Sequence, residues 1–387
     1  MLVEGILLNR TSCLVCNLRR NVSQSRIITG TLQDKLKHYQ QETVPTAYSL
    51  QHYLDLTNHR PELYNLVRNE MPTRLSQVIT QLPHYFPQQV YHQRTAQFIQ
   101  DYFEMTFKEM ETLPQHVDMI DQKIESKFLE ILMRAGIRLS GTTEMLSEAL
   151  IASEVVNNEE NLLNIQDNLR RLFHQNLSVD VLVNVYKPKW TKKVSNYSCI
   201  DEHNDLKECL ERAYEDARYL CEQHYINAPE LSIHLDSDPV FPYVSSHLYL
   251  IFFELFKNSL RATVERFPEE EQLPPIIVNI SRVDDFISVV VEDSGGGMSE
   301  EMLKRARMFF STSAVLDTMS LYQGAHSSPL AGYGFGLGMV EIFSRYFGGN
   351  IDIQTEEGAG TRVILSFPCQ PSKAVENLHC YDSLSES

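Results

Sequence analysis

The sequence lacks several features that would narrow its class at once. It has no run of about 18 apolar residues, so no helix long enough to span a bilayer is expected. Basic residues number 34 against 51 acidic ones, and the net charge of −17 argues against nucleic acid as a general partner. The seven cysteines are scattered, and the pair Cys13 and Cys16 has no second pair or histidine cluster at zinc spacing. Isolated thiols fit a reducing compartment, and the composition predicts a globular protein of two or three domains.

Acidic residues are scarce at the N-terminus, where Glu4 is the only one in residues 1–30. The same stretch carries Arg10, Arg19, Arg20 and Arg26, with serines and leucines between them. Few acids and spaced arginines are typical of a mitochondrial presequence rather than a secretory signal. A plain basic tail is the alternative. The presequence interpretation places the mature protein in the mitochondrial matrix.

Residues 34–186 carry apolar residues at three- and four-residue spacing, which predicts a helical bundle with short connections. Pro72 lies inside one expected helix and predicts a kink or a break there. Residues 187–200 are polar and basic and include the only tryptophan, Trp190, which indicates a linker. Contact of this basic stretch with an acidic partner is the alternative. The expected helices are 49–56, 62–82, 94–113, 117–139 (with an extension to 152 left open) and 162–186.

A polar stripe marks the apolar stretch His247–Phe267, which is itself typical of a buried helix. Glu254, Lys257, Asn258 and Arg261 fall at i, i+3, i+4 and i+7, so they project from one face. An acid, an amine, an amide and a guanidinium on an otherwise apolar helix indicate that this face meets an enclosed polar site. A structural ion-pair stripe is equally compatible with the spacing alone.

Three glycine-rich segments follow this helix. In residues 289–298, a β-branched strand is followed by Asp293 and three glycines. Residues 332–338 lie at the start of an expected amphipathic helix, and residues 358–361 precede the last expected strand. Glycine lets the backbone approach a ligand closely, and exposed N–H groups at a helix start suit phosphate oxygens. Alternating apolar residues in 351–355 and 361–367 predict strands. Residues 201–369 are therefore expected to form an α/β sandwich with a mixed sheet, and the whole chain is α+β.

These four pieces, in this order, resemble the N, G1, G2 and G3 boxes of the gyrase, Hsp90, histidine kinase and MutL type of ATP-binding domain. The phrases SHLYLIFFELFKNSLRATVE and PLAGYGFGLGMVEIFSRYFGG are similar to mitochondrial protein kinases of the pyruvate dehydrogenase kinase family, which includes the branched-chain 2-oxo acid dehydrogenase kinases. The segment LYNLVRNEMPTRLSQVITQLPHYFP resembles the N-terminal bundle of that family. The ordinary protein-kinase motifs and the Walker A pattern are both missing.

The resemblance implies ATP and Mg²⁺ as cofactors and assigns roles to residues. Asp293 would accept the adenine amino group, and Asn258 would hold Mg²⁺. Glu254 would polarise the attacking hydroxyl. Lys257 and Arg261 would stabilise charge or pair with Glu254, and the two roles are not separable from sequence. The long connection 299–331 would be the ATP lid, because loops of this length are often lids. The other expected nucleotide contacts are Gly295, Gly297, Ser311, Thr312, Gly332, Tyr333, Gly334, Phe335, Gly336, Leu337 and Thr361.

The sequence also departs from the family pattern. Leu250 stands one turn before Glu254, where pyruvate-type members usually carry a histidine, and leucine cannot hydrogen-bond the carboxylate. Gly338 stands where the family commonly has proline. The short tail, residues 370–387, shows no likeness to the family's Asp-Trp tail, so docking of lipoyl domains by the tail is left open.

The expected function is a protein-serine kinase that inactivates the E1 subunit of the pyruvate dehydrogenase complex with Mg-ATP. A homodimer is expected from the family, with no nucleic acid and no membrane insertion. The alternatives are an ATP-binding pseudokinase of the same complex, which Leu250 and the tail favour, and a kinase for the branched-chain dehydrogenase. A histidine kinase is a weaker alternative, because no His-Glu or His-Asp acceptor pair lies on the bundle helices.

Overall fold

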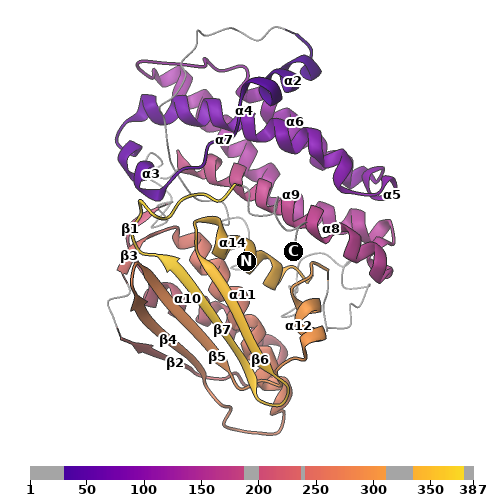
Figure 1. The fold of residues 1–387 in the computed structure, drawn as a ribbon, viewed down its shortest axis with the longest axis vertical. Coiled ribbons are helices and arrows are strands. Elements are labelled where there is room, and N and C mark those ends of the chain that lie inside the picture. The colour runs from indigo at the N-terminus through magenta and orange to yellow at the C-terminus, as the bar shows by residue number, and fades with distance from the viewer. Residues whose placement is uncertain (1–29, 187–199, 237–239, 311–333, 379–387) are drawn as a thin grey trace. The chain divides into compact units, whose positions relative to one another are not determined.

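The computed structural model describes residues 30–186, 200–236, 240–310 and 334–378. These residues form two compact units. The helical unit comprises the chain up to Asp201 together with the segment that starts at Val375, and the nucleotide-site unit spans Glu202–Ala374. The chain therefore leaves the first unit, builds the second and returns to the first, as the colours of Figure 1 allow the reader to follow.

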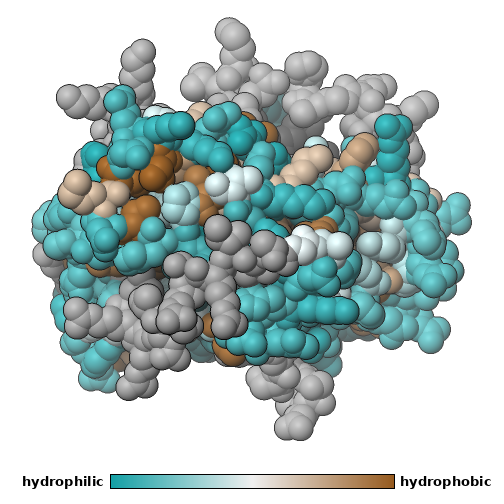
Figure 2. Space-filling view, turned by 90° about the horizontal axis from the view of Figure 1, so that it is seen from above, coloured by the Kyte–Doolittle hydropathy of each residue, from teal (hydrophilic) through white to brown (hydrophobic). Residues whose placement is uncertain are grey.

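The helical unit is built on two long helices, α4 (Arg60–Tyr85) and α9 (Glu159–Val185), which pack against each other. Helix α9 begins where the Asn158 side chain accepts a hydrogen bond from the backbone of Asn161, a usual N-cap arrangement. Figure 2 shows this unit from above, where hydrophilic residues predominate and hydrophobic ones gather in a few separate places. The remaining helices are α2 (Leu32–Glu42), α3 (Leu50–Leu56), α5 (Gln88–Tyr91), α6 (Arg94–Met110), α7 (Gln122–Ser140), α8 (Thr142–Ala152) and the short 3₁₀ helix η1 (Val155–Asn157).

Helix α4 does not break at Pro72, contrary to one of the two expected outcomes. A proline inside a helix costs about 3 kcal/mol through its missing N–H and its ring. Here the helix is buried on nearly all sides, and Leu66, Val67, Met71 and Leu75 are wholly inaccessible to solvent. Burial of that much apolar surface offsets the local cost, so tertiary packing overrides the proline.

The nucleotide-site unit contains a five-stranded sheet in the order β2-β4-β5-β7-β6. Strand β2 pairs with β4 in parallel, and the other pairs are antiparallel, so the sheet is mixed. A smaller ladder joins β1 (Asp201–Asp205) and β3 (Val240–Tyr243), two strands that the sequence pattern had not revealed. The sheet strands are β2 (Leu231–Leu235), β4 (Ile276–Val283), β5 (Phe286–Asp293), β6 (Asn350–Glu356) and β7 (Gly360–Pro368).

Helices cover the apolar face of this sheet. Alternate residues of the central strands, such as Val289, Val291, Val363 and Leu365, are buried, as a one-sided sheet requires. Helix α11 (Ser245–Arg266) packs on β5 and on α10 (Leu206–His224), while α14 (Gly336–Tyr346) packs on α11 and β6. A short helix, α12 (Glu300–Ala306), follows β5. The predicted fold class, a helical bundle followed by an α/β sandwich with a mixed sheet, is confirmed. None of the described helices is long and apolar enough to cross a membrane.

Candidate functional site

Helix α11 carries the predicted polar stripe at the centre of the nucleotide-site unit. Its apolar faces are buried, with Phe252, Phe256 and Leu260 inaccessible to solvent. Along the stripe, Lys257 is buried, Glu254 and Arg261 are partly buried, and Asn258 is exposed. An exposed amide beside buried charges is the arrangement expected of a face that can receive a ligand.

Glu254 is held by its neighbour one turn along the helix. Its Oε2 lies 2.7 Å from the Lys257 Nζ, and that ammonium group also lies 5.1 Å from the centre of the Phe253 ring. A side chain added at Gly336, the first residue of α14, would put its Cβ 2.7 Å from the same Glu254 Oε2. Glycine at 336 is therefore what lets the carboxylate lie against the backbone at the start of α14.

Arg261 is paired along the same helix. Its Nε donates to Glu265 Oε1 at 2.7 Å, four residues along the same helix. Lys257, the other basic residue of the stripe, is paired with Glu254.

Asp293 lies at the end of β5 beneath this helix, and its carboxylate accepts three hydrogen bonds. Oδ2 accepts from the Ser259 hydroxyl at 2.9 Å, and Oδ1 accepts from the backbone N–H groups of Gly295 at 2.9 Å and Thr361 at 3.2 Å. Burial raises the pKa of Asp293, and these hydrogen bonds partly offset that rise. The carboxylate is fixed in direction and retains lone pairs that can accept from an amino group.

The glycine loop after Asp293 is packed tightly against the last hairpin. Gly297 has a φ of +65°, and a Cβ there would lie 1.9 Å from the carbonyl oxygen of Glu356, so no other residue fits without movement of the backbone. The Gly358 N–H donates to the carbonyl of Gly296 at 2.7 Å. Thr361, the expected support of the adenine end, is the register partner of Asp293 on β7. A cavity of about 360 Å³ opens at these strand ends, lined by Asp293 and Thr361 among others.

The start of α14 packs against the end of the segment that contains α12. The ring of Phe335 lies against the rings of Phe309 and Phe310, and the Gly334 carbonyl accepts from the Phe310 N–H at 3.1 Å. A Cβ at Gly338 would lie 2.7 Å from the buried Phe309 ring. The glycine found here in place of the family's proline therefore makes room for Phe309. Leu337 lies in the first turn of α14 beside Gly336.

Four predicted site residues, Ser311, Thr312, Gly332 and Tyr333, lie outside the described residues. The described part of the chain brings the others together on α11, at the end of β5 with its glycine loop, at the start of α14 and on β7. Within the same described ranges, no group of three or more His, Cys, Asp or Glu side chains is arranged to hold a metal ion. The residue expected to hold Mg²⁺ is the exposed amide of Asn258, which together with phosphate oxygens would suit that ion.

Sequence reasoning missed two residues that shape the site. Ser259 fixes Asp293 through its hydroxyl, and the signal was available, since it is the polar residue that breaks the apolar side of α11. Arg266, in the last turn of α11, donates to the carbonyls of Gly295 at 2.7 Å and Gly358 at 2.5 Å, so it ties the two glycine loops together. No local sequence pattern indicated that contact.

Comparison with known proteins agrees with this geometry. Residues 243–371 match the family model described as Histidine kinase-, DNA gyrase B-, and HSP90-like ATPase, the class that this sheet, α11 and the glycine loops define.

Over the full length, the chain is 32% identical across 372 residues to a protein of Ascaris suum named pyruvate dehydrogenase (acetyl-transferring) kinase, mitochondrial, with 92% of this chain and 91% of the relative covered. The Drosophila melanogaster protein of the same name is 28% identical, with 88% and 86% covered. The Homo sapiens isozyme 4 is 25% identical, with 91% and 88% covered. The chain belongs to the pyruvate dehydrogenase kinase family, and the resemblance found in the sequence is confirmed.

Proposed function

We propose that this chain is a mitochondrial protein-serine kinase that uses Mg-ATP to phosphorylate and inactivate the E1 component of the pyruvate dehydrogenase complex. The names of its relatives support the pyruvate dehydrogenase complex as the target and the mitochondrion as the location. The observation that carries the proposal is the Glu254 carboxylate, which is paired with Lys257 and lies against Gly336 at the start of α14. The matrix as the compartment and a homodimer as the working form are parts of the same proposal.

The residues present fit ATP and Mg²⁺. When bound, Mg-ATP supplies a transferable phosphoryl group whose charge the metal offsets. Asp293 accepts from the adenine amino group, and Ser259 and the loop N–H groups hold its carboxylate in place. Asn258 presents its exposed amide to the metal, and the backbone of Gly334, Gly336 and Leu337 faces the phosphates.

Glu254 takes the hydroxyl proton of the substrate serine, and Lys257 keeps this carboxylate in position. A carboxylate that is hydrogen-bonded and paired is oriented before substrate arrives, which is most of what phosphoryl transfer requires of a protein.

A pseudokinase of the same complex is the second candidate, and Leu250 favours it. The side chain one turn before Glu254 has no hydrogen-bonding group, so nothing at that position can tune the carboxylate. In that case the site would bind ATP and regulate the complex without transferring phosphate.

The deciding experiment incubates the full-length chain with labelled ATP and either purified pyruvate dehydrogenase or the branched-chain dehydrogenase, and measures label on serine. The control variant Glu222→Ala removes an exposed acid of α10, which pairs with Arg218, and should behave as the parent does. Label on pyruvate dehydrogenase alone supports the proposal, and label only on the branched-chain enzyme transfers it to that substrate. ATP binding without label on either protein would establish the pseudokinase.

A further inference from the structure

The last described residues, Val375–Leu378, return to the helical unit and pair with the segment before α3. The Glu376 N–H donates to the Tyr48 carbonyl at 2.9 Å, and the Tyr48 N–H donates to Glu376 Oε2 at 3.2 Å. Ser49 and Val375 form an antiparallel bridge beside these bonds. This short segment, here called the strap, is thus attached by its backbone as an added strand would be.

The Glu376 side chain pairs with the guanidinium of Arg74 on α4. Arg74 Nη1 donates to Glu376 Oε1 at 3.0 Å and Nη2 donates to Oε2 at 2.7 Å, a bidentate fork. The two side chains are 2% and 0% exposed, so the pair is dry. Arg74 is immobilised further by the carbonyls of Thr46 at 3.0 Å and Ser178 at 2.8 Å.

A second carboxylate orients the guanidinium from the other side. Glu70 Oε2 accepts from Arg74 Nε at 3.1 Å, and the Thr46 N–H donates to the same carboxylate at 3.1 and 3.3 Å. Arg74 therefore has one acid from its own helix and one from the far end of the chain. Of the two acids, Glu70 lies on α4 itself, whereas Glu376 lies on a separate short segment, so the Glu376 contact can be broken without unfolding α4.

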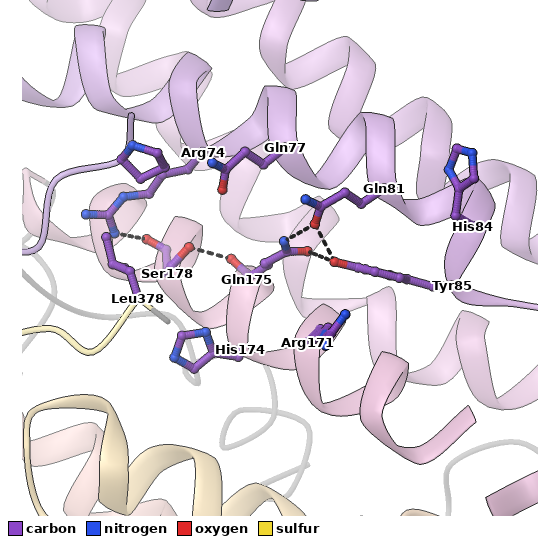
Figure 3. Close-up of a pocket in the computed structure, with 11 residues that line it drawn as sticks. Arg74, Gln77, Gln81, His84, Tyr85, Arg171, His174, Gln175, Ser178 and Leu378 are labelled. Atoms are coloured by element: carbon purple, nitrogen blue, oxygen red, sulfur yellow. Dashed lines mark hydrogen bonds between the residues drawn. The ribbon is translucent and has the colours of Figure 1, made fainter. Parts of the chain in front are cut away.

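The strap also borders a cavity of about 340 Å³ between α4 and α9 (Figure 3). Leu378 of the strap and Arg74 of α4 both line this space. The Gln175 amide donates to Gln81 Oε1 at 2.7 Å, an exposed hydrogen bond that links the two helices beside the cavity. The described lining includes both polar and apolar residues and no Asp or Glu; its residues are Pro45, Arg74, Gln77, Gln81, His84, Tyr85, Arg171, His174, Gln175, Ser178 and Leu378.

We infer that the strap is a separate fastening element: the Glu376 carboxylate, seated in the Arg74 fork, holds residues 375–378 against α4 within the helical unit and opens independently of the helices. The strap begins directly after Ala374, the last residue of the nucleotide-site unit. Opening the strap exposes the Arg74 side of the cavity while both units stay folded.

Limited proteolysis of the full-length chain tests this inference, because a tryptic bond lies next to the strap. The Lys373 side chain is about half exposed, but Ala374 after it is buried, so cleavage of that bond requires the strap to open. The Lys127–Phe128 bond inside α7 serves as the internal reference, since Phe128 is fully buried and its cleavage requires the helices to open. Mass spectrometry follows both bonds over time under native conditions.

Glu376→Gln is expected to speed cleavage after Lys373 by at least about tenfold, because it removes the charge from a buried fork. The same variant should leave the α7 bond within twofold of the parent. Asn377→Gln, in the exposed part of the strap, is the matched control and should cleave as the parent does. Glu376→Asp keeps the charge but shortens the arm, so it should fold in every case and give an intermediate acceleration.

Two results would overturn the inference. Unchanged cleavage after Lys373 in both Glu376 variants would mean that the carboxylate does not fasten the strap. Parallel acceleration at Lys373 and in α7 would mean that Glu376 stabilises the helical unit as a whole and that the strap has no opening of its own.

Discussion

Helices α11 and α4 each carry an acid–base pair within a largely apolar surface, Glu254 with Lys257 and Glu70 with Arg74. The surroundings of the two pairs differ. In α11 the pair of Glu254 and Lys257 is followed by the exposed amide of Asn258, and Gly336 faces the acid. In α4, Arg74 is enclosed by Glu70 from its own helix and Glu376 from the strap. A polar stripe therefore indicates a ligand site only where one member remains exposed and glycine backbone lies opposite.

The largest effect should come from the acid of α11. Glu254→Ala is expected to lower phosphoryl transfer about a thousandfold, the usual loss when a general base is removed, with ATP affinity nearly unchanged. Labelled transfer to the dehydrogenase and a separate ATP titration measure the two properties. Normal transfer by this variant would show that Glu254 is not the base.

The acid–base pair of α4 should matter for folding instead. Arg74→Met leaves Glu70 and Glu376 buried without their cation, which costs about 3–5 kcal/mol of unfolding free energy. Urea unfolding followed by circular dichroism measures that loss, and nucleotide titration of the folded variant should match the parent. A variant as stable as the parent would show that the acid–base pair of α4 does not stabilise the fold.

Substitution of Asp293 tests the proposed adenine pocket next to α11. Asp293→Ala should weaken ATP binding at least about a hundredfold, or roughly 2.7 kcal/mol, because the adenine amino group loses its acceptor. Asp352→Asn is the matched control, since Asp352 is an exposed residue of β6 that accepts a hydrogen bond from Gln354. Equal ATP affinity in Asp293→Ala and the parent would place the adenine pocket elsewhere.

The smallest effect is a pH dependence at the start of α11. His247 is packed among Phe343, Tyr346 and Phe347, and burial lowers its pKa to about 3. The unfolded chain has a histidine pKa near 6.5, so this group's contribution to stability is present above that pH and is lost as pH falls towards 3. The loss should reach about 2 kcal/mol at pH 5.

His247→Phe should abolish that part of the pH dependence, because phenylalanine fills the same aromatic environment without a titrating nitrogen. Unfolding free energies of the parent and the variant between pH 7.5 and pH 5 give the comparison. Parallel pH profiles for the two proteins would show that His247 is not a source of acid sensitivity.

The sequence predicted the fold class and the elements that carry the site, because these depend on local patterns. The stripe of α11, the Asp293 strand end and the glycine loops each lie within a few residues and follow helical or strand periodicity. Pairing with Glu254 was one of the two roles left open for Lys257, and the side-chain geometry shows that pair, whereas charge stabilisation by Lys257 stays a prediction.

The features that sequence reasoning missed depend on distant contacts. Arg74 meets Glu376 from 302 residues away, and Arg266 reaches Gly358 across 92 residues, so no window of sequence contains both partners. The break considered at Pro72 was wrong for a related reason, since local propensity cannot register the burial that keeps α4 continuous. The short pairing of β1 with β3 joins strands on either side of α10 and was likewise invisible.

The position of Glu376 in the sequence also affects the order in which contacts form during translation. During translation the α4 arginine emerges early, but its second acid emerges only after the whole nucleotide-site unit has been synthesised. The Arg74–Glu376 contact is therefore the last one of the helical unit to form, after the sheet has been synthesised. Nascent chains that stop before residue 376 should contain every helix and still leave the Arg74 fork without its second acid.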